Sequence, residues 1–201
     1  MEKYDKVYPF TEKFEEKLPG NKNIKGYLSR YGVSFVFLKN FSERKRTKKQ
    51  EISNWRWLET INVAPLSVTK LTIRNLELWQ AKQIFHRAFW EPSNLDELPV
   101  QMAALIFDAS VDRGIFYGVQ LAQRGFNRLV FYGVRLDEDG EMGPLTKKAL
   151  RMTNNATCWD AIIAEREKFY DDIVLDKPSQ SVFLGDWKER CRDLRRFLET
   201  L

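Results

Sequence analysis

The sequence has few of the residues that build metal sites or disulfide frameworks, and it lacks a long apolar run. It holds two cysteines and one histidine in 201 residues, and Cys158 and Cys191 lack metal-ligand spacing. Two thiols in a chain of this size are more typical of reduced core residues than of a disulfide framework. No apolar run approaches the roughly 20 residues that cross a membrane, and MEKYDKVYPF lacks the apolar core of a signal peptide. We therefore expect a chain made in the cytoplasm without a metal, a cofactor or a membrane span.

Strand patterns are also scarce, with VSFVFL and RLVFYGVRL as the two candidates, and no internal repeat or low-complexity linker occurs. Helical spacing instead recurs in LELWQAKQIFHRAF, PVQMAALIFDASVDRG, CWDAIIAEREKFYDDI and WKERCRDLRRFLETL. The second segment is apolar on nearly every side and is predicted to be a buried central helix over Pro99 to Arg113. With 43% apolar residues, the chain is expected to form a mainly α-helical single domain with little or no sheet.

Charge is balanced outside one segment. The stretch KNFSERKRTKKQ, Lys39 to Gln50, sets six basic residues against Glu43, a local excess of +5 that equals the net charge of the chain. Such a run can bind a polyanion. However, no nucleic-acid recognition motif is present, and no aromatic residues alternate with the basic ones to stack on bases. We therefore interpret it as a mobile, solvated loop, and nucleic acid is not the expected partner.

Two further motifs are interpreted as structural. The loop DEDGEMGPLT resembles a calcium-binding loop, but Lys148 stands where an EF-hand places its bidentate glutamate, so a simple turn is predicted. His86 has no Cys or His partner at ligand spacing and is assigned a polar surface role.

The opening segment PFTEKFEEKLPG carries two adjacent carboxylates, Glu15 and Glu16. Pro9 suits a first helical turn, and Pro19 with Gly20 cannot continue a helix. Apolar residues recur every four positions between them: Phe10, Phe14 and Leu18. Both glutamates therefore lie near the C-terminal end of a predicted helix, where negative partial charge disfavours an ionised carboxylate. That environment suits a general acid, although solvated helical glutamates without a catalytic role are the commoner case.

Several landmarks follow one another along the chain. They are YGVS at Tyr31 to Ser34, TIRNLELWQAKQIFHRAFWEP, DELPVQMAALIFDASVDRG, DEDGEMGPLTKKAL and PSQSVFLGDW. In this order they resemble the motifs of the bacterial and phage N-acetylmuramidases of glycoside hydrolase family 108, some of which are called secretion activator proteins. The resemblance implies a lysozyme-like single domain over 1–201. Its muramidase-like half would span 1–98, and a helical, peptidoglycan-binding-like half would span 99–201.

The resemblance also implies a reaction, cleavage of the β-1,4 bond between N-acetylmuramic acid and N-acetylglucosamine. Counting back from Tyr31 at the family's spacing places Glu15 on the catalytic glutamate, as general acid, while no second carboxylate can be placed. The candidate substrate-binding residues are Gly26, Ser29, Tyr31, Trp90 and Asp108. Core packing stays open as the alternative for Tyr31 and Trp90, and a satisfied buried polar group for Asp108. The expected partners are peptidoglycan glycan strands, with a holin or secretion system for release from the cytoplasm, and the chain is expected to be a monomer.

The chain departs from the family pattern near the proposed chemistry. The family's Glu-Gly-Gly is here Glu15-Glu16-Lys17, a paired glycine is Tyr27, and an asparagine is Arg30. Glycines allow close approach of backbone and substrate, which these side chains would obstruct. The alternative function is therefore a catalytically impaired lysozyme-fold protein that acts in cell-wall binding, as a scaffold or in secretion.

Overall fold

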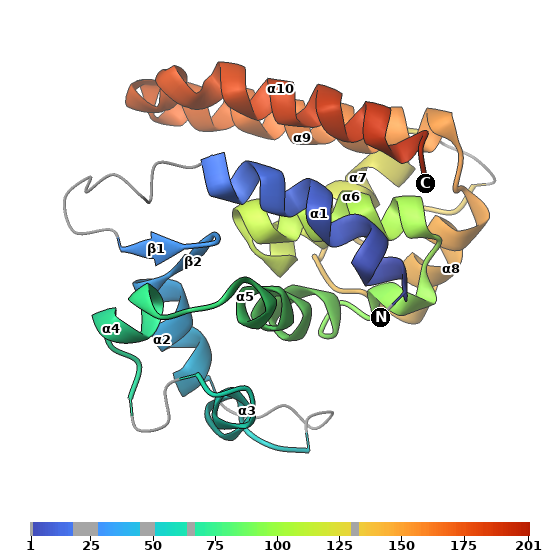
Figure 1. Ribbon diagram of the computed structural model, residues 1–201. Helices are drawn as coiled ribbons and strands as arrows, with labels where there is room; N and C mark the ends of the chain where they lie inside the picture. The colour runs from blue at the N-terminus through green and yellow to red at the C-terminus, as the bar shows by residue number, and fades with distance from the viewer. Residues whose placement is uncertain (1, 18–27, 45–50, 64–66, 130–132) are drawn as a thin grey trace. The chain divides into compact units, whose positions relative to one another are not determined.

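The computed structural model describes residues 2–17, 28–44, 51–63, 67–129 and 133–201 (Figure 1). In these ranges the protein is mainly α-helical, with one two-stranded sheet, which confirms the predicted fold class. The elements, in chain order, are α1 (Glu2–Lys17), β1 (Ser29–Arg30), β2 (Val33–Ser34), α2 (Phe35–Glu43), α3 (Asn54–Thr60), α4 (Lys70–Arg74), α5 (Leu78–Phe85), a π-helix (His86–Trp90), a 3-10 helix (Leu95–Glu97), α6 (Val100–Arg113), α7 (Ile115–Arg128), α8 (Pro144–Met152), α9 (Ala156–Asp176), a second 3-10 helix (Pro178–Gln180) and α10 (Ser181–Leu198).

The chain divides into two compact units. The hairpin unit is Glu12–Ala88, and the helical unit combines Met1–Thr11 with Phe89–Leu201. Both boundaries fall inside helical segments, the first within α1 and the second within the π-helix. The prediction of a single domain with halves at 1–98 and 99–201 stays a prediction. Among the described residues, no helix combines the length and apolar character needed to cross a bilayer.

The hairpin unit contains the sheet. β1 and β2 pair antiparallel with Ser29 opposite Ser34 and Arg30 opposite Val33. Helix α2 follows at once because the Ser34 hydroxyl accepts a hydrogen bond of 3.1 Å from the backbone N–H of Phe37. The core of this unit is formed by fully buried aliphatic side chains, among them Val33, Leu38, Leu58, Ile73 and Ile84.

Both strand predictions need correction. In VSFVFL only Val33 and Ser34 are strand, and α2 begins at Phe35. The Ser34 cap starts the helix, and Leu38 and Phe41, three residues apart, then face the core, so helical packing outweighs the β-propensity of the segment. In RLVFYGVRL, residues 130–132 lie outside the described part, Arg128 ends α7, and 133–136 form no strand.

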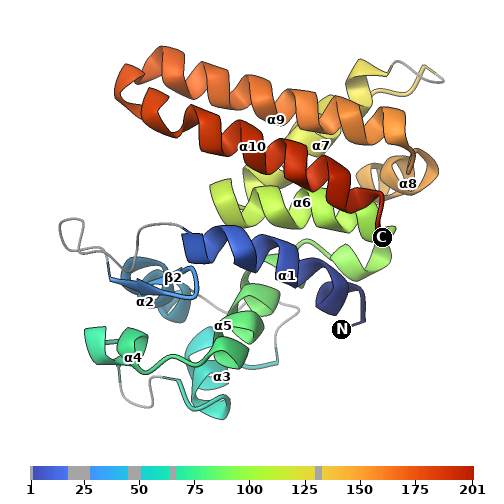
Figure 2. The ribbon, with the colours of Figure 1, turned by 45° about the horizontal axis from the view of Figure 1, so that its top comes forward.

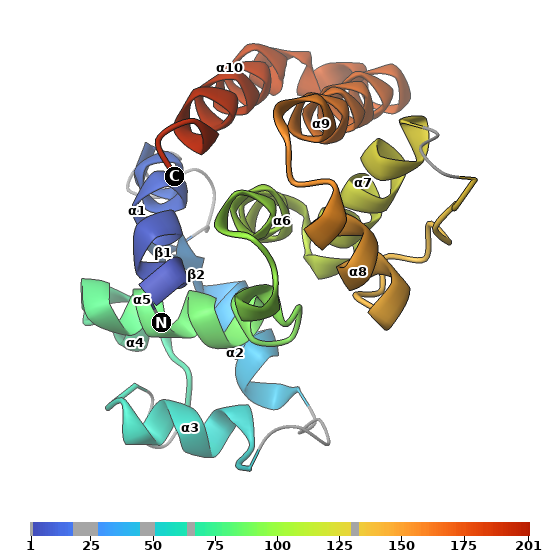
Figure 3. The same cartoon turned by 90° about the vertical axis from the view of Figure 1, so that its right-hand side faces the viewer.

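Helix α6 is the centre of the helical unit, as predicted. Nine consecutive residues from Met102 to Ser110 are buried, and the helix contacts α7, α9 and α10 (Figures 2 and 3). It ends at Gly114, whose φ of 95° is one that residues with a side chain rarely adopt. Both cysteines are buried, free thiols in this unit, and burial raises the pKa of Cys191 to about 11.

Helix α1 begins earlier than the sequence suggested. Pro9 was expected in the first turn, but α1 starts at Glu2 and encloses Pro9. A proline inside a helix removes one backbone hydrogen bond and costs about 3 kcal/mol. Burial of Tyr4, Val7 and Tyr8 before the proline offsets this cost, since large apolar side chains contribute about 1.5–3 kcal/mol each. Tertiary packing therefore extends the helix across a residue that usually starts one.

Close approach of α7 to α9 depends on Gly125. A Cβ added at this position would lie 2.5 Å from Ile162 Cγ1 and 2.6 Å from Ile162 Cα. We expect Gly125→Ala to destabilise the protein by about 1–3 kcal/mol despite the better helix propensity of alanine. Gly185 in α10 is the matched control, because a Cβ there meets no atom of the described residues within 4 Å. Gly185→Ala should stabilise by about 0.5–1 kcal/mol. Urea unfolding measures both, and shifts of the same sign would contradict this account.

Candidate active site

Glu15 lies in the last turn of α1, within the hairpin unit. Its side chain is only 9% exposed, which is unusual for a glutamate. A Cβ added at Gly32 would lie 2.6 Å from Glu15 Cβ, 3.1 Å from Glu15 Cγ and 3.1 Å from Phe85 Cζ. The stem of Glu15 therefore packs directly on the backbone of Gly32, and Phe85 of α5 borders the same space. The glycine lets the glutamate lie against the hairpin.

The hairpin turn has an uncommon composition. Tyr31 and Gly32 are the two central residues between paired Arg30 and Val33, and their φ values are 51° and 77°. Positive φ at both central residues is characteristic of a type I′ turn, whose twist matches that of the flanking strands. Glycine adopts such a φ readily, whereas a tyrosine at this position is a genuine exception. An observed backbone of this kind points to a functional constraint on the turn.

Arg30 holds the tip of the hairpin. Its guanidinium lies 5.1 Å from the ring centroid of Tyr31, donates to the Tyr31 hydroxyl at 3.4 Å, and donates to the carbonyl oxygen of Arg74 at the end of α4. The cation–π contact and the two hydrogen bonds fix the half-buried tyrosine ring beside the turn. Arg30 is therefore part of the site structurally, although the sequence singled it out only as a departure from the family.

The other predicted site residues lie in different surroundings. Ser29 is half-buried in β1 and faces the side of the hairpin opposite to Arg30. Gly26 lies outside the described residues. We expect Glu16 to point to solvent, but its side chain is likewise outside the described part. In the hairpin unit the structure thus places Glu15 against Gly32 of the hairpin turn, while Ser29 and Tyr31 belong to the same hairpin.

Trp90 occupies the core of the helical unit. Its side chain is fully buried, 5.2 Å from the ring centroid of Tyr4 and 5.6 Å from that of Phe107, with both pairs edge-to-face. No face of the indole is open to a sugar in this structure. Core packing, the alternative that the sequence left open, accounts for the residue.

Asp108 is also fully buried, in the middle of α6. Its oxygens accept hydrogen bonds from Arg166 at 2.7 Å, from Arg190 at 2.8 Å and from the Thr11 hydroxyl at 2.9 Å. Burial alone would raise the pKa of Asp108, but the two guanidinium charges outweigh it and hold that pKa well below its ordinary range. The carboxylate is saturated by protein donors and lies out of reach of a substrate. Asp108 therefore fits the alternative that the sequence left open, a buried polar group satisfied by hydrogen bonds.

Sequence reasoning missed the two arginines of this network. Arg166 in α9 and Arg190 in α10 are only 2% and 6% exposed. Arginine is normally a surface residue, and nothing in the spacing of the two helices separates these from the exposed arginines around them. The one available signal is Asp108 itself, because a carboxylate in an otherwise apolar buried helix requires cationic or hydrogen-bonding partners.

His86 and the acidic turn can also be placed. His86, the first residue of the π-helix, is 9% exposed, so the predicted surface role is wrong. The DEDG segment is a turn, as predicted, and Gln123 of α7 organises it by donating to Asp139 at 2.8 Å and accepting from Gly140 N–H at 2.9 Å. Across the described ranges, no group of three or more His, Cys, Asp and Glu side chains is placed to hold a metal ion.

The fold and the site together define the class. A mainly helical chain with a buried glutamate at a helix end, packed against a small hairpin, is lysozyme-like. The family model described as glycosyl hydrolase 108 matches residues 15–114, a range that begins at Glu15. Over these residues the chain belongs to this family.

Comparison with solved structures supports the same fold. The structure described as that of Brucella abortus SagA is similar with a TM-score of 0.66 over 98% of this chain and 94% of that one. The two sequences are 16% identical, so this likeness bears on the fold alone. The search of curated proteins found no match.

Proposed function

We propose that the protein is a peptidoglycan hydrolase of the N-acetylmuramidase type, with Glu15 as the general acid. The reaction is hydrolysis of the β-1,4 bond between N-acetylmuramic acid and N-acetylglucosamine. Glu15 would protonate the departing glycosidic oxygen as positive charge develops on the sugar ring, and water would complete the cleavage. Family membership supports the reaction class, and the expected partner is the glycan strand of the cell wall.

One observation carries the assignment of Glu15. It is a carboxylate kept 9% exposed at a helix end, with its stem on a glycine that no other residue could replace without a clash. A surface glutamate needs no such accommodation. A general acid needs a fixed carboxylate with restricted access to water. The packing of the Glu15 stem on Gly32 and the low exposure of the residue support this role.

Two neighbours are suited to bind the sugar. The Tyr31 ring, held by Arg30 and only half-buried, can pack against a pyranose face, and the Ser29 hydroxyl can donate to or accept from a sugar hydroxyl. Because Trp90 and Asp108 are fully buried in the helical unit, the proposal does not include them.

The test is hydrolysis of purified peptidoglycan. Active protein should lower the turbidity of a cell-wall suspension and release fragments whose new reducing ends are N-acetylmuramic acid, identified by borohydride reduction and mass spectrometry. Fragments that end in reducing N-acetylglucosamine would show that the protein is a glycosidase but cleaves the other glycosidic bond of the strand, which would overturn the bond assignment.

One observation favours a second function. Arg30, where the family carries asparagine, binds both the Tyr31 ring and the Arg74 carbonyl and closes the hairpin tip with a bulky side chain. A protein so altered could retain glycan binding and lose turnover, acting in wall binding, as a scaffold or in secretion. Sedimentation with insoluble peptidoglycan, in the absence of any soluble product, would favour this function.

Gly32 offers a test of the glutamate's position. Gly32→Ala places a methyl group 2.6 Å from Glu15 Cβ and at a φ of 77°. Gly133→Ala is the matched control, since its φ is 66° and a Cβ there meets nothing within 4 Å among the described residues. Both variants should lose about 1–2 kcal/mol of stability from the left-handed backbone, and Gly32→Ala about 1–3 kcal/mol more from the clash.

The activities should separate the two glycine variants further. Displacement of Glu15 by Gly32→Ala should lower the rate of cell-wall hydrolysis by about 10²-fold, because small misplacements of a catalytic group have effects of this size. Gly133→Ala should keep wild-type turnover below its unfolding transition. Equal activity of the two folded variants would contradict the placement of Glu15.

A further inference from the structure

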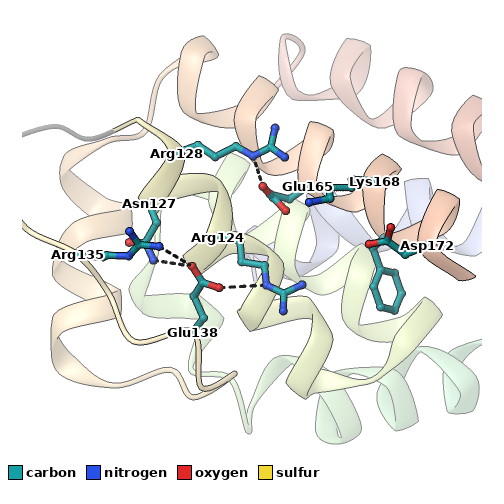
Figure 4. A pocket seen from close by; sticks show the side chains of 9 residues that line it. Arg124, Asn127, Arg128, Arg135, Glu138, Glu165, Lys168 and Asp172 are labelled. Carbon is teal, nitrogen blue, oxygen red and sulfur yellow. Dashed lines mark hydrogen bonds and ion pairs between the residues drawn. The ribbon is translucent and has the colours of Figure 1, made fainter.

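The helical unit contains a charged pocket far along the chain from Glu15. It has a volume of about 390 Å³ and lies between α7 and α9, with the segment after α7 along one side (Figure 4). This volume falls within the roughly 300–1,000 Å³ typical of small-molecule sites. The lining contains one more cation than anion, together with one amide and one aromatic ring: Arg124, Asn127, Arg128, Arg135, Glu138, Glu165, Lys168, Phe169 and Asp172.

The carboxylates of Glu138 and Glu165 hold the arginines in place. Glu138 accepts from Arg124 Nε at 3.3 Å and from Asn127 at 3.0 Å, and it pairs with Arg135 at 3.8 Å. Glu165, whose side chain is 10% exposed, pairs with Arg128 Nε. In Figure 4 the dashed contacts of Arg124 and Arg128 both end on the inner nitrogen of the guanidinium.

This arrangement leaves donors without acceptors. Arg124 and Arg128 use Nε for their ion pairs, and their terminal Nη groups have no partner among the described residues. Lys168 on α9 has no hydrogen bond or ion pair in the same ranges, even though Asp172 stands one turn further along the helix. Positioned guanidinium groups with open Nη atoms bind the oxygens of carboxylate or phosphate in pairs, and an ammonium adds a point charge.

The geometry points to a binding site for a small oxyanion, a carboxylate or a phosphate group, held by Arg124, Arg128 and Lys168. Glu138 and Glu165 are positioning residues for the guanidinium groups. Phe169 supplies an apolar wall for the body of an organic ligand. Asp172, which has no partner in the described part of the chain, faces the anion as an unfavourable charge and limits its affinity.

Calorimetric titration tests the site on the whole chain at low ionic strength, with inorganic phosphate and with glutarate as separate probes. At least one probe should bind saturably with one site per chain. Binding of phosphate alone would identify a phosphate site, and binding of glutarate alone a carboxylate site. Absence of saturable binding for both probes would overturn the proposal.

Substitutions locate the binding. Lys168→Gln should lower the affinity for the bound probe about tenfold, which corresponds to the loss of one charge-assisted contact. It should leave the unfolding midpoint unchanged, since Lys168 has no partner to lose among the described residues. Lys177→Gln, the same change at an exposed lysine just after α9, should leave affinity unchanged. Equal weakening by both would show non-specific attraction by net charge and would overturn the site.

Asp172→Asn gives a readout that structural damage cannot imitate. Removal of the repelling carboxylate should strengthen binding of the same probe several-fold, while a loosened pocket would weaken it. Weaker binding in a folded Asp172→Asn variant would contradict the role assigned to this residue. Because the measurement is binding rather than turnover, it stands whether or not Glu15 proves catalytic.

Discussion

Glu15→Gln should nearly abolish hydrolysis of purified cell walls, with a loss of about 10²–10⁴ in rate. Glutamine keeps the size of the side chain and its packing on Gly32 but has no proton of the required acidity. The measurement is the initial rate of turbidity decrease across a range of pH values, together with release of reducing ends. Circular dichroism should match the wild type, because the stem contacts of Glu15 are retained.

Glu16→Gln is the matched control for this substitution. It makes the same chemical change one residue later on α1, and the predicted register gives Glu16 no catalytic role. Its rate should therefore lie close to that of the wild type. Equal losses of rate in the two variants would refute the alignment that places Glu15 on the family's catalytic glutamate. An inactive wild type that still sediments with cell walls would favour the binding function.

Where the sequence pattern was unambiguous, the prediction of the fold succeeded. Helix α6 was located between Pro99 and Gly114 because a proline, a continuous apolar stretch and a glycine mark its start, its burial and its end. The pattern failed in VSFVFL, where β-branched and aromatic residues suggested a strand but the Ser34 cap and the packing of Leu38 begin a helix. Short apolar runs fit either structure, and only the surrounding core decides between them.

The candidate site could be predicted in part. The position of Glu15 near a helix end follows from residue types and spacing, whereas the turn at Tyr31 and Gly32 was not predicted. That the glutamate packs on that glycine is a tertiary contact between segments separated in the chain, and no local pattern encodes it. Trp90 is the converse case: an indole suits a sugar platform or a core equally well, and burial against Tyr4 and Phe107 places it in the core.

The buried ion pairs of Asp108 should dominate the stability of the helical unit. Asp108→Asn removes the charge that Arg166 and Arg190 share while both remain buried. Uncompensated buried charge of this kind costs about 3–5 kcal/mol. Urea unfolding at pH 7 measures the loss. Asp160→Asn is the control, because Asp160 pairs with Arg195 at 2.5 Å but is 59% exposed, and such surface pairs contribute about 0.2–1 kcal/mol.

The pH dependence of the free energy of unfolding distinguishes a charge effect from a packing defect. The two arginines hold the pKa of Asp108 below its ordinary value of 3.8, so its stabilising contribution is fully present well above that value. As pH falls below about 4, the unfolded chain takes up the proton before the folded one, and the contribution declines. The difference in the free energy of unfolding between the wild type and Asp108→Asn should therefore narrow by about 1 kcal/mol between pH 7 and pH 3. A difference that stays constant over this interval would show that the asparagine disturbs packing rather than the charge balance of the two arginines.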